Sequence, residues 1–260
     1  MFALTEANAT YAEFQVQSQG LGLLDSNYRL VEQARLEEKF RQNLYNPELV
    51  IYSVATHCLA NSIGIDEGFQ AYKYSSALAT FCLNLPKQLF YHLKIPKEFS
   101  IWGDRVKALQ ELADPGFAFF TIAKQAPFYQ NNISIEEWLQ KAIENAGLPD
   151  LDEINNLILL EMDELKSDIV DGIYKNQLKY LLSLGKENFA KRGIFGKNGL
   201  SIENLHQNSM TLPPIVLGDG STTNVAQKIT SDTPQGIEKW IEDIVEIEVS
   251  IDQFLRACRF

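Results

Sequence analysis

The sequence predicts an all-α fold, a single domain built as a multi-helix bundle. Three observations support this prediction. Apolar residues recur at steps of three and four along most of the 260 residues, which is the spacing of one helix face. Capping residues open these stretches, and Gly or Pro closes them. Residues 186–233 lack such a period, so they are predicted to form an irregular insertion, as a long loop or a small β-hairpin. A C-terminal helix over 234–258 is predicted to follow the insertion and complete the single domain, 1–260.

The composition is that of an ordinary globular protein with an acidic surface. A chain of 260 residues, 45% of them apolar, needs neither disulfides nor a structural metal, because chains of this size bury roughly three quarters of their unfolded surface. Its three cysteines have no metal or redox spacing and suit a reducing cytoplasm. The net charge of -11 disfavours nucleic acid as a partner. With no apolar stretch near the ~20 residues of a membrane span, and no signal peptide, we expect a cytoplasmic protein.

Local signals place a series of helices in the first half of the chain. Asn46 followed by Pro47 is a typical helix start. The helix that begins there is apolar nearly all round, which predicts that it is buried. Asp114-Pro115-Gly116 is interpreted as a turn. The expected ranges are 3–16 (a helix or a loose arm), 26–44, 47–62, 66–85, 98–113, an aromatic run over 117–122, and a helix from the capping box Ser134 to Glu137 as far as Gly147.

The stretch from Asp150 to Gly185 has the clearest helical period of the chain. Asp150 is predicted to cap its first turn, and Glu153, three positions on, completes a capping box. Gly172 lies in the middle and costs about 1 kcal/mol against alanine, so a bend or break is expected there. We expect this helix to organise the core. The residues expected to be nearly fully buried are Ile158, Leu165 and Ile169.

Four acidic residues form a stripe on this helix and are the candidate metal ligands. Glu161, Glu164, Asp168 and Asp171 follow one another at steps of three and four. Carboxylates at this spacing can share a hard cation such as Mg²⁺. The pair Asp168 and Asp171 is similar to the D-x-x-D element with which helical isoprenoid enzymes hold magnesium and diphosphate. Such enzymes need a second acidic motif facing the first, and the sequence offers poor candidates for it. A solvated helix face is therefore the simpler interpretation.

No other motif is specific for a known type of active site. The three histidines are too few and too scattered for most zinc or di-iron sites, and His57, beside Cys58, is expected to be structural. The loops 193–198 and 218–223 offer glycines and hydroxyls to an anion, but turn chemistry explains them equally well.

Aromatic residues are concentrated in the first half of the chain. Such residues either fill a helical core or line a pocket for an apolar ligand, and the core interpretation is favoured. They are Phe69, Tyr72, Tyr74, Phe81, Phe90, Tyr91, Trp102, Phe117, Phe119, Phe120, Phe128 and Tyr129.

Two classes of function remain open. The first is an intracellular, non-catalytic interaction or accessory protein that binds a protein partner through a helix face or the insertion 186–233. The alternative is a helical-pocket enzyme or carrier for an apolar small molecule, isoprenoid-like or tetrapyrrole-like, with Mg²⁺ held at the acidic stripe. The missing catalytic spacings favour the first class, and the aromatic first half favours the second. No catalytic residue is assigned, and no cofactor is predicted for the first class.

Overall fold

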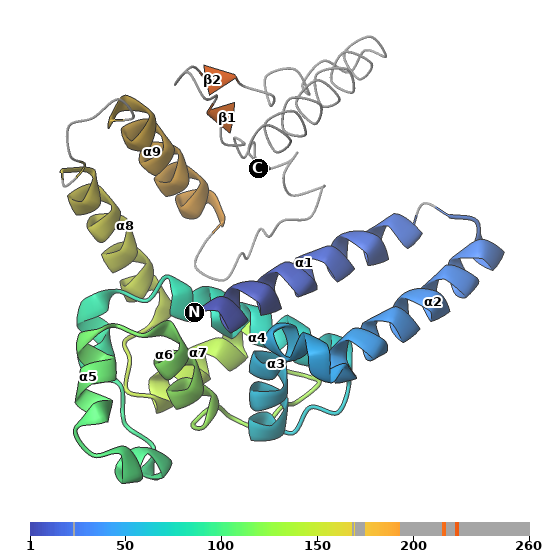
Figure 1. The fold of residues 1–260 in the computed structure, drawn as a ribbon, viewed down its shortest axis with the longest axis horizontal. Helices are drawn as coiled ribbons and strands as arrows, with labels where there is room; N and C mark the ends of the chain where they lie inside the picture. Colours follow the sequence, from blue (N-terminus) through green and yellow to red (C-terminus); the bar gives the residue numbers. More distant parts are fainter. Residues whose placement is uncertain (23, 168, 170–174, 193–214, 217–221, 224–260) are drawn as a thin grey trace, which may run out of the picture. The chain divides into compact units, whose positions relative to one another are not determined.

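The chain is described by a computed structural model. The residues that the structure describes are 1–22, 24–167, 169, 175–192, 215–216 and 222–223. Helices make up most of this part, so the all-α prediction is confirmed (Figure 1). None of the described helices is long and apolar enough to cross a lipid bilayer.

The chain divides into two compact units. Unit 1 comprises Met1–Glu164 and Phe189–Asn208, and unit 2 comprises Leu165–Asn188 and Ser209–Phe260. The single domain over 1–260 stays a prediction. In unit 1, α1 and α2 form a helical hairpin that extends from the other helices (Figure 1).

The helices of the first half begin and end close to the predicted residues. The first α-helices are α1 (Phe2–Leu21), α2 (Ser26–Tyr45), α3 (Val50–Ile63) and α4 (Gly68–Leu83). Short 3₁₀ helices are η1 (Pro47–Leu49), η2 (Lys87–His92) and η3 (Lys97–Trp102). The later α-helices are α5 (Arg105–Glu111), α6 (Pro115–Ala123), α7 (Ile135–Asn145), α8 (Leu151–Ser167) and α9 (Lys175–Arg192).

The predicted capping residues define several of these ends. Three side chains accept a hydrogen bond from a backbone N–H two or three positions on, which satisfies a donor that has no partner inside the helix. These bonds run to Asn46 from Glu48 (2.9 Å), to Ser134 from Glu137 (3.1 Å) and to Asp150 from Glu153 (2.8 Å). Gly64 ends α3 in the left-handed conformation, with φ at 72°.

Helix α4 lies at the centre of the unit 1 core. It contacts α1, α2, α3, α6 and α7. Its buried side chains point to several sides rather than one, and Tyr72, Leu78 and Phe81 are each 0% exposed. A helix packed from several sides must be apolar over most of its circumference. The core is therefore built around α4 and not around the stretch from Asp150 to Gly185, so that prediction is wrong.

Helix α3 is less buried than its apolar sequence predicts. Leu59 and Ile63, near its end, are 0% exposed, whereas Val50, Ile51 and Val54, near its start, are 57%, 43% and 44% exposed. The prediction of a fully buried helix is therefore wrong for the first turns. An apolar sequence around the whole helix permits burial on all sides, but neighbouring helices must be there to supply it.

The predicted helix over 98–113 is two elements, η3 and α5. Gly103, between them, has a φ of 52°, which turns the chain in a conformation that side chains disfavour. The predicted turn at Asp114 is instead the start of α6. The Asp114 carboxylate accepts a hydrogen bond from the backbone N–H of Phe117 at 2.8 Å, and Pro115 occupies the first helical position.

The predicted long helix over 150–185 is also divided. Helix α8 ends at Ser167 and α9 begins at Lys175, and Gly172 lies between them, outside the described residues. Ile158 is buried as predicted, but Leu165 is 54% exposed and Ile169 is half-buried. The apolar face of α8 packs against the core from Leu151 as far as Met162.

Within the predicted insertion, the structure describes α9 up to Arg192 and two short strands. Strand β1 (Ile215–Val216) pairs antiparallel with β2 (Thr222–Thr223). Each strand has only two paired residues, which is too few to establish the hairpin. The hairpin therefore stays a prediction. The C-terminal helix over 234–258 lies outside the described residues.

Candidate functional site

The acidic stripe of α8 is described only in part. Glu161 is half-buried and Glu164 is exposed, while Asp168 and Asp171 lie outside the described residues. In the part of the chain that the structure describes, no three His, Cys, Asp or Glu side chains gather as a metal site would require. The four-carboxylate site therefore stays a prediction.

The charge of Glu164 acts on Glu161, its neighbour on the stripe. Partial burial raises the pKa of Glu161, and the negative charge of Glu164 raises that pKa further. A hydrogen bond from the backbone of Lys87 opposes this rise by stabilising the carboxylate. A cation would relieve the repulsion between the two carboxylates. The same repulsion is expected wherever two acidic residues follow each other on a solvated helix face.

His57 and Cys58 have structural surroundings. The His57 Nε2–H donates a hydrogen bond to the Leu44 carbonyl at 2.9 Å, and this bond joins α3 to the last turn of α2. Burial raises the pKa of the Cys58 thiol, although the nearby Lys124 charge lowers it. Burial also raises the pKa of the Cys82 thiol well above its ordinary value. Both thiols are thus held in the protonated form, which is the unreactive one.

The aromatic residues of the first half mostly fill the core. Tyr74 packs edge-on against Tyr129 and Trp138, with ring centroids 5.3 Å and 5.0 Å apart. Most of the set is buried or half-buried, and the exposed members are Tyr91, Trp102 and Phe128. The core interpretation is confirmed for the buried members, because their rings contact one another and leave their surfaces covered.

The α1–α2 hairpin is held to the core by a second aromatic cluster. The Phe40 ring packs edge-on against Phe14 at 4.3 Å and against Tyr72 at 4.9 Å. An ion pair between Lys39 and Glu13, at 3.3 Å, also joins the two helices. Both charged side chains of this pair are about half exposed, so the aromatic contacts provide most of the attachment.

A groove opens beside this cluster, between the second half of α1, one side of α2 and the start of α4. Its volume is about 570 Å³, within the range of small-molecule sites. Phe14, Leu36, Phe40 and Phe69 contribute apolar surface, and several charged side chains reach it from α2 and from the start of α4. We call it the hairpin groove. Of the twelve aromatic residues singled out above, only Phe69 lines it.

A different side of α2 carries a second apolar surface, which we call the α2 outer face. It is a shallow depression of about 640 Å³ on α2 alone, lined by Leu30, Val31, Ala34, Arg35, Glu38, Lys39 and Gln42. Leu30 is 69% exposed and Val31 is 53% exposed. Its apolar end lies toward the start of α2, and charged residues follow along the helix.

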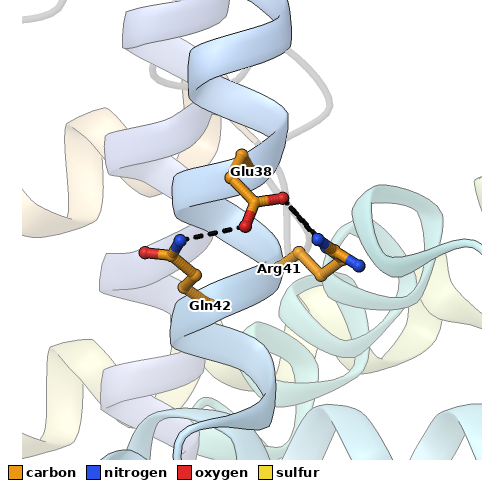
Figure 2. A network of polar contacts seen from close by, with 3 residues as sticks. All are labelled: Glu38, Arg41 and Gln42. Carbon is orange, nitrogen blue, oxygen red and sulfur yellow. Dashed lines mark hydrogen bonds and ion pairs between the residues drawn. The ribbon is translucent and has the colours of Figure 1, made fainter.

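A polar network orders the charged part of the α2 outer face. Figure 2 shows Arg41 and Gln42 converging on the Glu38 carboxylate. Arg41 donates from Nη2 at 2.6 Å and from Nε at 3.1 Å, and Gln42 donates from Nε2 at 2.9 Å. These bonds lower the pKa of Glu38, and the bond from Arg41 has the largest effect. The network contributes little to folding because it is exposed, but it keeps a charge fixed on this surface.

The sequence contained one local signal for the α2 outer face. Leu36, Phe40 and Leu44 follow one another at steps of four and face inward. Val31 lies five residues before Leu36, which places it about 140° away around the helix. An apolar residue that far from the buried row indicates a second apolar surface. The hairpin groove had no such signal, since its lining comes from three separate segments.

Comparison of the chain with protein families, with curated proteins and with solved structures finds no match. The geometry of the site therefore carries the functional argument alone.

Proposed function

We propose that the chain is a non-catalytic interaction protein that binds a protein partner through the α2 outer face. The observation that carries this proposal is the exposure of Leu30 and Val31, 69% and 53%, on a helix that packs against the molecule only through its second half, at Leu36, Phe40 and Leu44. Apolar side chains at that exposure, next to an ordered charged network, resemble the apolar centre and polar rim of a protein interface.

Leu30 and Val31 supply part of the energy of a reversible interaction. Full burial of a leucine or valine side chain contributes about 1.5–3 kcal/mol. Leu30 and Val31 are already partly covered, so their burial supplies about 2–4 kcal/mol together. A micromolar complex needs about 8 kcal/mol beyond the entropic cost of association. The partner is therefore expected to contact more of the hairpin, including Tyr28, which is 70% exposed.

The experiment compares partner capture by the parent and by the double variant Leu30→Glu and Val31→Glu. Two carboxylates in the apolar part of the surface should abolish binding of the partner without unfolding α2, since both positions are exposed. Leu160→Glu is the matched control, because it adds a charge at a leucine that is 61% exposed elsewhere in unit 1. A captured protein is then purified and titrated against all three chains. Equal affinity for the parent and the double variant would refute the proposal.

The hairpin groove supports the second function, binding of an apolar small molecule. Its volume of about 570 Å³ and its apolar lining residues on α1, α2 and α4 favour this alternative. Neither Glu161 nor Glu164, the two described residues of the stripe, lines the groove.

A thermal-shift screen with isoprenoids, tetrapyrroles and fatty acids tests the groove. Ser18 lines it from α1 and is exposed, so Ser18→Trp should fill part of the space without disturbing the core. Thr5→Trp, also at an exposed position of α1 but outside the lining, is the control. A ligand at a hundredfold excess over its Kd stabilises the fold by about 2.7 kcal/mol. A shift that survives Ser18→Trp would place the ligand elsewhere.

A further inference from the structure

One segment of unit 1 has the opposite charge from the chain as a whole. Residues 87–107 contain five basic and two acidic side chains, a net charge of +3, although the whole chain carries -11. The basic residues are Lys87, Lys94, Lys97, Arg105 and Lys107, and the acidic ones are Glu98 and Asp104. All seven positions are exposed. We call this segment the basic turn.

The basic turn presents two large apolar side chains to solvent. Ile101 is 85% exposed and Trp102 is 45% exposed, and both lie at the end of η3. Directly after them, Gly103 turns the chain with a φ of 52°. An isoleucine at this exposure has almost no contact with its own molecule, so it contributes little to folding and remains available for binding.

These two side chains stand on a rigid support. Phe99, in the same η3 helix, is 3% exposed and anchors the turn in the core. Its ring lies 5.2 Å from the rings of Phe117 and Phe120 on α6, and 4.8 Å from the ring of Trp102, edge-on. Trp102 is thus held against a fixed ring, and little side-chain entropy is lost when it enters a binding site.

The cations lie close enough to act together with the apolar pair. Four residues of a 3₁₀ helix span about 8 Å, which is the separation of Lys97 from Ile101 along η3. Arg105 follows Trp102 by three residues, which limits the separation to about 11 Å. Both separations are near the Debye length, which is about 8–10 Å at moderate salt. None of the five basic side chains forms an ion pair with another described residue.

The choice of residues favours a lipid surface over a protein partner. Four of the five cations are lysines, which are depleted in protein interfaces, whereas arginine is enriched there. A lysine ammonium keeps its hydration and acts as a point charge, which suits lipid phosphates and carboxylates without fixed positions. Tryptophan is enriched where hydrocarbon meets water, because its ring is apolar and its N–H is polar.

We propose that the basic turn docks on an anionic phospholipid surface. Ile101 and Trp102 enter the region between headgroups and acyl chains, and Lys97, Arg105 and their neighbours contact the anionic headgroups. The negative charge of the remainder of the chain weakens the attraction at long range. Salt screens this repulsion beyond about 10 Å, so contact is governed by the local charge. The surface is separate from the α2 outer face, and α5 and the α1–α2 loop lie at opposite ends of the view in Figure 1.

The experiment measures binding of the full chain to phospholipid vesicles by flotation. One set of vesicles is phosphatidylcholine alone, and the other contains about a third phosphatidylserine. We expect binding to the anionic vesicles only, and loss of binding when ionic strength rises from about 0.1 M to 1 M and the Debye length falls to about 3 Å. Equal binding to both kinds of vesicle would overturn the proposal, and so would no binding to either.

Variants separate the contribution of the basic residues from that of the apolar pair. Each basic residue near an anionic surface contributes about fivefold to the partition coefficient, so the double variant Lys97→Gln and Arg105→Gln should lower it on the order of thirtyfold. Ile101→Glu should lower it more than tenfold. Leu160→Glu is the control, because Leu160 of α8 is 61% exposed and lies outside both the basic turn and the α2 outer face, so vesicle binding should be unchanged. Vesicle binding that survives Ile101→Glu would overturn the proposal. Soluble polyglutamate that competes fully with the vesicles would assign the basic turn to an acidic polypeptide instead.

Discussion

Helices α4 and α8 differ in the pattern of their apolar residues and in how many other helices pack against them. Helix α8 has the clear apolar stripe, and α4 is apolar over most of its surface. In the structure α4 is packed by α1, α2, α3, α6 and α7, whereas among the described side chains of α8 only Ile154 and Ile158 are buried. A clear stripe means that one side of the helix faces the core and the other faces solvent. A helix with a clear stripe, such as α8, can therefore lie at the edge of a core rather than at its centre.

The first turns of α3 show that an apolar sequence does not by itself ensure burial. Val50, Ile51 and Val54 are exposed even though the helix is apolar nearly all round. Residues of this kind form a core only where other elements cover them. The rule that follows is that a stripe identifies the buried side of a helix, while continuous apolarity identifies a candidate for the centre.

The strongest test of the comparison is a pair of leucine-to-alanine variants. Leu78 of α4 is 0% exposed and Leu165 of α8 is 54% exposed. Leu78→Ala should cost about 2–5 kcal/mol, because it removes buried methyl groups and leaves a cavity. Leu165→Ala should change stability by less than about 0.5 kcal/mol. Urea denaturation of both variants measures the difference. A cost at Leu165 equal to that at Leu78 would restore α8 as the organising helix.

Alkaline unfolding tests the burial of α4 by a second property. Burial raises the pKa of Tyr72 to about 12, against about 10 for an unperturbed tyrosine. Below pH 10 the phenol is neutral in both the folded and the unfolded chain. Between pH 10 and 12 the unfolded chain loses the proton and the folded chain keeps it, so stability should fall as pH rises.

The measurement is urea denaturation of the parent and Tyr72→Phe at pH 8 and across the alkaline range. The variant loses the hydrogen bond from the Tyr72 hydroxyl to the Tyr52 carbonyl, 3.1 Å long, and this loss is present at every pH. The part of the alkaline loss due to Tyr72 should be absent from the variant. Parallel curves for the two chains would show that Tyr72 ionises freely and that α4 is accessible.

Helix ends were predictable from the sequence, and the packing of helices was not. The caps at Asn46, Ser134 and Asp150 depend on residues two or three positions apart, so a local pattern contains all the information. The division of 98–113 at Gly103 was missed because the flanking residues favour a helix. The positive φ of a single glycine cannot be predicted from the sequence. The hairpin groove was missed because it combines residues 14–21, 33–45 and 66–69, which are brought together only by tertiary packing.

The capping bond of α8 provides a smaller test. Asp150 accepts a hydrogen bond from the Glu153 backbone N–H, and Ser134 accepts the equivalent bond at the start of α7. Loss of either cap should cost about 1 kcal/mol. Trp138 and Leu139 of α7 are buried in its second turn, so Ser134→Ala should lower the stability of the whole unit. If α8 is peripheral, Asp150→Ala should release mainly α8 itself. Hydrogen exchange of the α8 amides distinguishes this local opening from global unfolding.

The smallest expected effect concerns Glu161 of α8, whose pKa is raised by partial burial and by the charge of Glu164. Near pH 3 the carboxyl is protonated in the folded and the unfolded chain and costs nothing. As pH rises through its folded pKa, the folded chain must accommodate the charge, and stability is lost. Glu161→Gln should therefore be more stable than the parent at pH 7 by about a few tenths of a kcal/mol, because the position is only partly buried and solvent screens most of the effect.

The same substitution, made in the Glu164→Gln variant and measured with and without magnesium, also tests the acidic stripe. In Glu164→Gln, the gain from Glu161→Gln should shrink, since one of its two causes has been removed, and burial accounts for the remainder. If the stripe binds Mg²⁺, millimolar magnesium should reverse the sign, because Glu161→Gln would then remove a ligand from the folded state and lose the stabilisation that binding provides. Thermal melts of the four chains, with magnesium and with EDTA, measure both effects. A gain that magnesium leaves unchanged would identify the stripe as a solvated face of a peripheral helix.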